Sequence, residues 1–308
     1  MGLCKLLLTL ILISASFFYY LTQYTNLIKK YKCKYAVITG STGGIGKELT
    51  SQLIKKMNVI TVARNPAELE KIQEQYKDEQ FKIVPFVFDF VDDLNTFSDK
   101  FDQFLTEKGI DKQEVGMCFS NAGYGDYKPF ESYNYIEKAK FVQVNFDAHL
   151  AICDYFCKLF LTRKNTKSAL VITSSALSHT PGKYFALYHT TKAALSSLGN
   201  ALYAEYRRKG IDVLVVHPSS VSNTKFYQHK GIKAEGDKTM PVIGQIENSF
   251  IAVTPKQVVN RMLTRVGKIN QSQVGWAAVS TALFATCSGR NIQGWIWSLF
   301  SLNDKLVK

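Results

Sequence analysis

The chain has 308 residues, 46% of them hydrophobic, which is enough to bury the core of one large domain and to leave an appendage. Its 38 basic and 25 acidic residues give a net charge of +13. No basic run is interleaved with aromatic residues, which excludes a nucleic-acid-binding face and leaves an anionic membrane, a phosphate-bearing cofactor or an acidic substrate to match this charge. The six cysteines lack CxxC and CxxH spacing, which excludes a zinc site and indicates reduced, packed thiols: Cys4, Cys33, Cys118, Cys153, Cys157 and Cys287.

The first feature along the chain is a long uncharged segment, Leu6–Ile28. A helix of this length crosses the hydrocarbon core of a bilayer, and the tyrosines near its end are typical of a membrane interface. A cleaved signal peptide is the alternative, but bulky residues (FFYY, 17–20) stand where small residues precede a cleavage site. We therefore expect a retained transmembrane helix in an anchor at 1–32. Four lysines follow, so the positive-inside rule predicts a domain in the cytosol: Lys29, Lys30, Lys32 and Lys34.

After residue 34, short β-branched runs alternate with longer amphipathic segments. We expect strands at 35–39, 58–63, 82–88, 114–120, 169–174 and 212–217. We expect helices at 46–56, 66–76, 92–105, 136–160 and 188–209. Strands that alternate with helices indicate βαβ units, and strands apolar on both faces indicate a sheet covered on both sides. The sequence therefore predicts an α/β fold with a doubly wound parallel sheet, a Rossmann fold, in a single domain at 33–270.

A glycine-rich stretch, TGSTGGIG at 39–46, lies between the first predicted strand and the first predicted helix. Glycines there allow a tight turn, close approach of the backbone to a pyrophosphate, and close packing of the helix on the strand. The helix N-terminus attracts the anion. This position predicts a dinucleotide site, although the spacing is G-x-x-x-G-x-G and not the common G-x-G-x-x-G.

This variant spacing resembles the cofactor motif of the short-chain dehydrogenase/reductase family, and further motifs follow in that family's order. They are NAG at 121–123, Asn145 in FVQVNFDAHL, Ser175 at the end of LVITSS, and YHTTK, which contains Tyr188 and Lys192. The resemblance covers most of the chain after the N-terminal segment and implies a nicotinamide-dependent oxidoreductase.

Finer features resemble the membrane-anchored hydroxysteroid dehydrogenase and very-long-chain 3-oxoacyl-CoA reductase branch of that family. They are the N-terminal anchor, GIGKEL, ARNPAELEKI, and TPKQVVNRMLTRVG at 254–267. Two features depart from the pattern. In HPSSVSNTK at 217–225, Ser219 replaces the glycine of the family's Pro-Gly loop and Thr224 comes one place late, and NAGYGDYKPF is closer to the wider family. These departures concern the substrate and leave the chemistry intact.

The residues of these motifs are suited to proton transfer. Tyr188 and Lys192 are four apart on a predicted helix, so their side chains share one face, where the ammonium is expected to lower the pKa of the tyrosine. Ser175 is predicted at the carboxyl end of a strand, where its hydroxyl can hold a substrate oxygen as charge develops. The resemblance implies that Lys192 also binds the nicotinamide ribose, and that Asn145 holds a water between Lys192 and solvent. Alone, such residues are surface groups or helix caps; together and in order, they predict a catalytic tetrad.

The second predicted strand ends with Arg64 and has no acidic residue there, which favours NADP(H) over NAD(H) because an arginine accommodates the 2′-phosphate. Asp89, after the third strand, matches the family position that hydrogen-bonds adenine, and a helix cap is its alternative role. The expected cofactor-binding residues are Thr39, Gly40, Ser41, Thr42, Gly44, Ile45, Gly46, Arg64, Asp89, Asn121, Ala122, Gly123, Tyr188, Lys192, Pro218 and Val221.

The histidines share no ligand spacing, so we expect no metal. We expect His189 on a helix surface, and His179, between Ser175 and Tyr188, is a candidate substrate contact. Beyond residue 270 the resemblance weakens. An uncharged segment at 274–288 is short for a membrane span, so we expect a buried or interfacial helix there, within a C-terminal extension at 271–308 that contacts the membrane.

The sequence thus predicts a membrane-anchored, NADPH-dependent carbonyl reductase of the endoplasmic reticulum membrane that faces the cytosol, with a homodimer left open. The expected substrate is a lipid-like carbonyl compound, either a long-chain 3-oxoacyl-CoA or a ketosteroid. The alternatives are a 3-ketosphinganine or retinal reductase of the same family and a catalytically idle, membrane-anchored binding protein. The intact tetrad argues against the idle protein.

Overall fold

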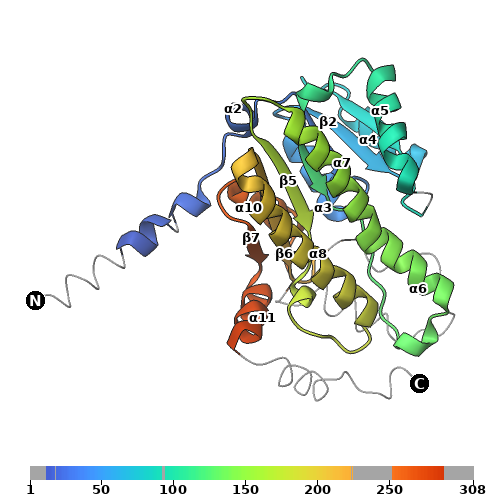
Figure 1. Cartoon of the computed structure of the whole chain (residues 1–308), viewed down its shortest axis with the longest axis vertical. Helices are drawn as coiled ribbons and strands as arrows, with labels where there is room; N and C mark the ends of the chain where they lie inside the picture. The colour runs from blue at the N-terminus through green and yellow to red at the C-terminus, as the bar shows by residue number, and fades with distance from the viewer. Residues whose placement is uncertain (1–11, 18, 92–93, 223, 225–251, 288–308) are drawn as a thin grey trace, which may run out of the picture.

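Seven parallel strands form one sheet in the order β3-β2-β1-β4-β5-β6-β7 in the computed structural model of the chain (Figure 1). The structure describes residues 12–17, 19–91, 94–222, 224 and 252–287. The strands are β1 (Tyr35–Thr39), β2 (Asn58–Ala63), β3 (Ile83–Val87), β4 (Val115–Ser120), β5 (Ser168–Thr173), β6 (Ile211–Pro218) and β7 (Gln271–Val274). The predicted doubly wound parallel sheet is confirmed, and the six predicted strands agree with the structure to within one residue at each end.

Helices cover both faces of the sheet. One hydrophobic core cluster receives side chains from α2 (Leu27–Tyr31), α3 (Gly44–Leu53), α4 (Pro66–Gln75) and α10 (Pro255–Arg265). The cluster on the other face receives them from α5 (Phe97–Glu107), α7 (Ala148–Thr162) and α8 (Ala186–Tyr206), with α6 (Tyr135–Val142) leading into α7. The strands are apolar on both faces for this reason; all six residues of β4, for example, are buried. The cysteines at 153 and 157 pack in this core, as predicted.

Because all strands are parallel, they begin at one edge of the sheet, the amino edge, and end at the other, the carboxyl edge. The glycine-rich loop follows β1, the NAG motif follows β4, and Ser175 follows β5, so all three lie at the carboxyl edge. Helix α2 precedes β1 and lies at the amino edge. The predicted cofactor and catalytic motifs are therefore separated from α2 by the length of the strands.

The N-terminal segment does not form the continuous helix to Ile28 that we predicted. Helical turns within 12–22 are followed by extended residues, and a separate helix, α2, starts after the N-cap Asn26. Leu27 is 2% exposed and belongs to the domain core, because α2 packs against the sheet. Residues 1–11 lie outside the described residues. Within the described part of the chain, no helix combines the length and the apolar character needed to cross a membrane.

Hydrogen bonds hold α2 tightly on the amino edge. The buried guanidinium of Arg163 donates to the backbone oxygens of Tyr31 and Lys32, at 3.0 and 3.2 Å. Lys30 forms an ion pair with Asp212 at 2.9 Å, at the start of β6. The path from the N-terminal segment into β1 is thus a fixed part of the domain.

Helix α11 (Trp276–Cys287) follows β7 and is only partly buried. Only Ala278 is buried, whereas Trp276 and Leu283 are 71% and 63% exposed. A buried core helix, one of the two alternatives for this segment, is therefore wrong. Residues 288–308 lie outside the described residues. Because α11 starts at the carboxyl end of β7, it lies at the opposite edge from α2.

Candidate active site

The glycine-rich loop packs so closely that side chains would not fit at two of its positions. Gly40 has φ +64°, and a Cβ there would lie 2.9 Å from the Cα atom of Ala122. A Cβ on Gly46 would lie 2.1 Å from the backbone oxygen of Gly40, so α3 can pack on β1 only with glycine there. The N-cap Gly43 supplies no side-chain acceptor to the first amides of α3. These amides suit the phosphates of a dinucleotide, and the loop fits such a cofactor.

The other predicted residues of this loop lie around the same turn. Ser41 is buried, and Thr42, Gly44 and Ile45 are half-buried. A Cβ on Gly44 would lie 2.6 Å from the Cγ2 atom of Thr224, which brings the loop after β6 beside the start of α3. In that loop Pro218 is the last residue of β6, and Val221 pairs with Val253.

Hydrogen bonds connect three strands at the carboxyl edge. The Thr39 hydroxyl oxygen accepts from the backbone amides of Asn121 and Ala122, at 2.9 and 3.0 Å. The Asn121 side chain in turn accepts from the Thr173 hydroxyl at 3.1 Å. The ends of β1, β4 and β5 are therefore joined into one rigid floor, and the catalytic candidates lie next to it.

Ser175 follows β5 and its side chain has two partners. Its hydroxyl oxygen accepts from the amide of Leu177 at 3.2 Å, which caps the short turn η5 (Ala176–Ser178). It is also hydrogen-bonded to Tyr188. The capping role and the catalytic role are thus compatible in this residue.

Tyr188 and Lys192 lie on α8, and both are buried, at 6% and 2% exposed. The Lys192 ammonium donates to the backbone oxygen of Thr173 at 3.0 Å and lies 5.7 Å from the centroid of the Tyr188 ring. The structure therefore brings Ser175, Tyr188 and Lys192 together, as the order of the motifs predicted.

Asn145 lies in a π-helical turn, η4 (Gln143–Asp147), between α6 and α7. Its side chain is fully buried, accepts from the amide of Tyr124 at 3.1 Å and donates to the oxygen of Phe141 at 3.1 Å. A Cβ on Gly123 would lie 2.8 Å from its Oδ1 and 3.7 Å from the Lys192 nitrogen, so the two side chains flank that glycine. π-Turns of this kind are frequent at functional sites.

Burial controls the electrostatics of the site. It lowers the pKa of Lys192 to about 7. It raises the pKa of Tyr188 above its ordinary value, and the Ser175 hydrogen bond acts in the lowering direction only as a smaller effect. Our expectation that Lys192 gives Tyr188 a depressed pKa is therefore wrong, because desolvation of the phenolate outweighs the other influences. Tyr188 is a protonated donor at neutral pH.

The two cofactor-selecting candidates lie at the carboxyl edge but differ in their surroundings. Arg64 is exposed at the end of β2 and lies close enough to Tyr124 to oppose the rise in that tyrosine's pKa. The Asp89 carboxylate accepts from the amide of Val91 at 3.1 Å, so it also caps the turn after β3.

Three histidines of the described residues near Ser175 have structural partners. The His179 ring lies 4.6 Å from that of His217 and bonds to the Gln273 amide at 3.1 Å. His217 in turn contacts the hydroxyl of Ser178 at 3.0 Å, behind Ser175. His189, expected on a helix surface, is half-buried against the backbone oxygen of Leu177.

Two contributors to the site escaped the sequence analysis. The backbone oxygen of Thr173 orients Lys192, and no motif marks a carbonyl group. Phe185 lies with its ring centroid 6.5 Å from that of Tyr188 and 4.8 Å from that of Tyr127. The three aromatic residues within 184–188 are a sequence signal from which such contacts could have been predicted.

The model of the short-chain dehydrogenase family matches residues 34–234, which include all four tetrad residues. The chain belongs to the short-chain dehydrogenase family. It is therefore an oxidoreductase of the class that acts on CH–OH and C=O groups with a nicotinamide cofactor.

Several curated proteins are similar to this chain, and their names refer to 3-oxoacyl-CoA reductases or hydroxysteroid dehydrogenases. A very-long-chain 3-oxoacyl-CoA reductase-like protein of Arabidopsis thaliana is 29% identical over 63% of this chain and 62% of its own length. The very-long-chain 3-oxoacyl-CoA reductase of Neurospora crassa is 29% identical over 81% of this chain and 69% of its own length. A human relative, 25% identical over 92% of this chain and 80% of its own length, is named inactive hydroxysteroid dehydrogenase-like protein 1.

Among solved structures, a 7β-hydroxysteroid dehydrogenase superposes with a TM-score of 0.71 at 18% identity, covering 89% of this chain and all of that one. This likeness supports the fold. The Arabidopsis match spans less than two thirds of that relative's length.

Proposed function

We propose that the chain is a membrane-attached, NADPH-dependent ketoreductase. The observation that carries this proposal is the convergence of the Ser175 hydroxyl, the Tyr188 phenol and the Lys192 ammonium at the carboxyl edge, on α8 and the end of β5. Ligands bind at this edge in open parallel sheets. A set of buried, neighbouring polar groups at that edge is suited to proton transfer to a carbonyl oxygen.

Each residue has a distinct role in this proposal. The Ser175 hydroxyl donates to the substrate carbonyl oxygen and fixes its position. The Tyr188 phenol, protonated at neutral pH, gives its proton to that oxygen as negative charge develops. Lys192, held by Thr173, stabilises the phenolate that remains, and it and Asn145 bracket the route by which Tyr188 regains a proton through water. The bound nicotinamide supplies the hydride.

Arg64 supports NADPH as the cofactor. It is an exposed cation at the end of β2, the position at which an arginine accommodates the 2′-phosphate, and β2 has no acidic residue at this end. With NADPH, which the cytosol keeps reduced, the expected direction is carbonyl reduction.

A long-chain 3-oxoacyl-CoA is the substrate that we favour. The Arabidopsis and Neurospora relatives are named for very-long-chain 3-oxoacyl-CoA reduction, and the anionic coenzyme A group suits the lysines of the segment after β6. Three of these lysines, Lys225, Lys230 and Lys233, lie outside the described residues. A ketosteroid, 3-ketosphinganine or retinal would gain little from cations.

The purified full chain tests this choice. We expect NADPH oxidation with a long-chain 3-oxoacyl-CoA, weakened by added salt because salt screens the attraction between the cations and coenzyme A. Tyr188→Phe is the blank for contaminating reductases. If the chain reduces a ketosteroid, 3-ketosphinganine or retinal but no acyl-CoA, that compound would replace the acyl-CoA as the proposed substrate. Absence of activity on every one, with NADPH still bound, would favour the idle alternative that the human relative's name represents.

Membrane attachment is proposed from the apolar N-terminal sequence and the lysines after it. We expect the chain to resist carbonate extraction from endoplasmic reticulum membranes. We also expect protease added to sealed microsomes to digest the domain, because the lysines hold this side in the cytosol. A protected domain would place the enzyme in the lumen. Release of the chain by carbonate would contradict the proposed membrane anchor.

A further inference from the structure

Basic residues gather at one edge of the sheet, and neither the cofactor nor the catalytic chemistry uses them there. The segments that lead into the seven strands are 32–34, 54–57, 76–82, 108–114, 163–167, 207–210 and 266–270. Together they contain fifteen lysines and arginines against four acidic residues. The described loops at the carboxyl edge contain three of each: Arg64, Lys128 and Lys183 against Asp89, Asp126 and Glu131. The described part of the domain is therefore more basic at its amino edge than at its carboxyl edge.

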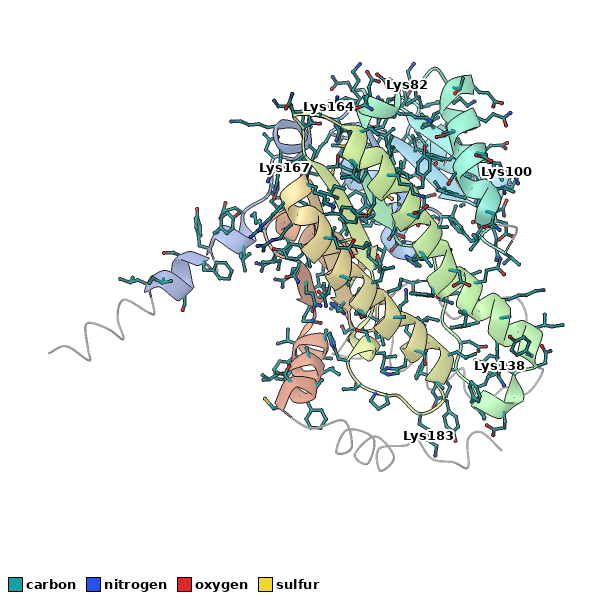
Figure 2. The ribbon with its side chains drawn as sticks, viewed as in Figure 1. Lys82, Lys100, Lys138, Lys164, Lys167 and Lys183 are labelled. Carbon is teal, nitrogen blue, oxygen red and sulfur yellow. The ribbon has the colours of Figure 1, made fainter. Side chains whose placement is uncertain are left out.

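Many of these cations are free to meet a ligand. Nine of them are exposed and form no ion pair within the described residues: Lys32, Lys55, Lys82, Lys108, Lys164, Lys167, Arg207, Arg208 and Lys209. Lys29 of α2 has the same properties and joins the set. We call this set the amino-edge basic surface. Figure 2 shows Lys82, Lys164 and Lys167 at the end of the molecule where α2 lies, and Lys138 and Lys183 at the opposite end.

The apolar N-terminal segment leaves the domain at this same edge. The Lys268 ammonium donates to the backbone oxygen of Tyr20 at 2.8 Å, so the helical turns of 12–22 end beside the loop between α10 and β7. Leu12, Ile13 and Phe17 on those turns are more than half exposed. An apolar segment flanked by a broad cationic surface is the combination that binds anionic bilayers.

We propose that the amino-edge basic surface binds anionic phospholipid headgroups, so that the domain lies on the membrane with its amino edge toward the lipid. This inference rests on the membrane attachment proposed above and adds an orientation to it. β1 alone spans about 17 Å at 3.3 Å per residue, so the carboxyl edge and Tyr188 face the aqueous side. That orientation suits a substrate whose head group is water-soluble, such as an acyl-CoA, and does not require it to enter sideways from the bilayer.

The exposed apolar residues of α11 offer the opposite orientation. Trp276, Val279 and Leu283 lie at the carboxyl edge and carry no charge to attract anionic lipid. The charge asymmetry favours the amino edge, and the experiment below discriminates between the two.

The test is amide hydrogen exchange of the full chain in nanodiscs of phosphatidylcholine, with and without phosphatidylserine. We expect slower exchange in 54–57, 163–167 and 207–210 when phosphatidylserine is present, because each lysine near the surface favours the bound orientation about fivefold. At about 1 M salt, where the Debye length is about 3 Å, this difference should disappear.

Matched charge reversals distinguish an effect of the amino-edge basic surface from an effect of the net charge of the protein. Lys164→Glu with Lys167→Glu should remove most of the phosphatidylserine effect, whereas Lys140→Glu with Lys183→Glu, the same change in charge at the other end, should preserve it. Equal exchange in both lipids, equal effects of the two pairs, or protection of α11 in place of the amino edge would overturn the proposal. If the chain does not enter phosphatidylcholine discs, that result would count against the membrane anchor and not against the basic surface. The same variants are then compared by flotation with phosphatidylserine vesicles.

Discussion

The ammonium nitrogen of Lys192 donates a 3.0 Å hydrogen bond to the carbonyl oxygen of Thr173, the last residue of β5. This bond fixes the Lys192 side chain of α8 against the carboxyl end of β5. Lys192 lies one helical turn from Tyr188. Thr173 also donates to Asn121, so the lysine is linked to the floor beneath the glycine-rich loop. The catalytic candidates and the cofactor loop therefore share one rigid support.

Replacing Tyr188 by phenylalanine tests the proton donor. Because the ring stays and only the hydroxyl is lost, the fold and NADPH binding should be retained. Turnover should fall by about 10²–10⁴-fold, the usual contribution of general acid catalysis, or by more. Tyr206→Phe, at the end of the same helix, is the matched control and should keep its turnover. Wild-type turnover in Tyr188→Phe, measured by NADPH oxidation, would remove Tyr188 from the mechanism.

The strands and the order of the catalytic motifs could be predicted because each depends on local sequence. β-Branched runs such as NVITVA coincide with β2, since apolar strands buried on both faces need that composition. β7 was missed because QSQV at 271–274 has no apolar run; it pairs with β6 through its backbone. α5 starts at Phe97, five residues later than predicted, after the turn η1 (Leu94–Thr96).

Features that depend on the assembled core could not be predicted. Asn145 was expected in a regular helix, but it lies buried in the π-turn between α6 and α7. The pKa of Tyr188 was expected to fall because Lys192 is close in sequence, yet the extent of burial, which only the fold determines, raises it. Likewise Leu27 continues an apolar run but is buried in the domain, because α2 has a place on the sheet.

Two glycine variants test the packing of the dinucleotide loop. A Cβ at Gly46 would lie 2.1 Å from a backbone oxygen, whereas a Cβ at Gly43 would meet its nearest neighbour at 3.6 Å. Gly46→Ala should lower the free energy of unfolding by about 1–3 kcal/mol and weaken NADPH binding, because α3 must move away from β1. Gly43→Ala should leave stability within about 0.5 kcal/mol. Chemical denaturation checks both, and equal stabilities would show that α3 is free to shift.

The charge of Arg64 should decide the choice of cofactor. Arg64→Asp replaces a cation by an anion at the end of β2, so the affinity for NADPH should fall while that for NADH is retained or improved. Arg207→Asp makes the same change at the amino edge and should alter neither affinity. Cofactor titration by fluorescence measures both. An unchanged ratio of NADPH to NADH affinity in Arg64→Asp would assign the 2′-phosphate to another residue.

His149 should make the protein sensitive to acid. It is fully buried; its Nε2 donates to the oxygen of Ala122 at 2.7 Å, which leaves Nδ1 of the neutral ring to accept from the Ser120 hydroxyl at 2.7 Å. Burial lowers the pKa of His149 to about 3 from an ordinary value of 6.5. The unfolded chain therefore binds a proton between pH 6.5 and 3 that the folded chain does not, and stability is lost as pH falls through this range, at about 1.4 kcal/mol per pH unit.

Two variants isolate this titration from the other buried histidine, His217, whose pKa burial also lowers to about 3. His149→Gln removes the titrating group, so the fall in the free energy of unfolding between pH 6.5 and 4 should be less steep than in the wild type, although the variant is less stable at neutral pH. Ser120→Ala deletes a hydrogen bond but keeps the histidine, so its stability should be lower at every pH with the wild-type slope. Urea denaturation at several pH values measures the slopes, and a wild-type slope in His149→Gln would contradict the assignment of the lost stability to His149.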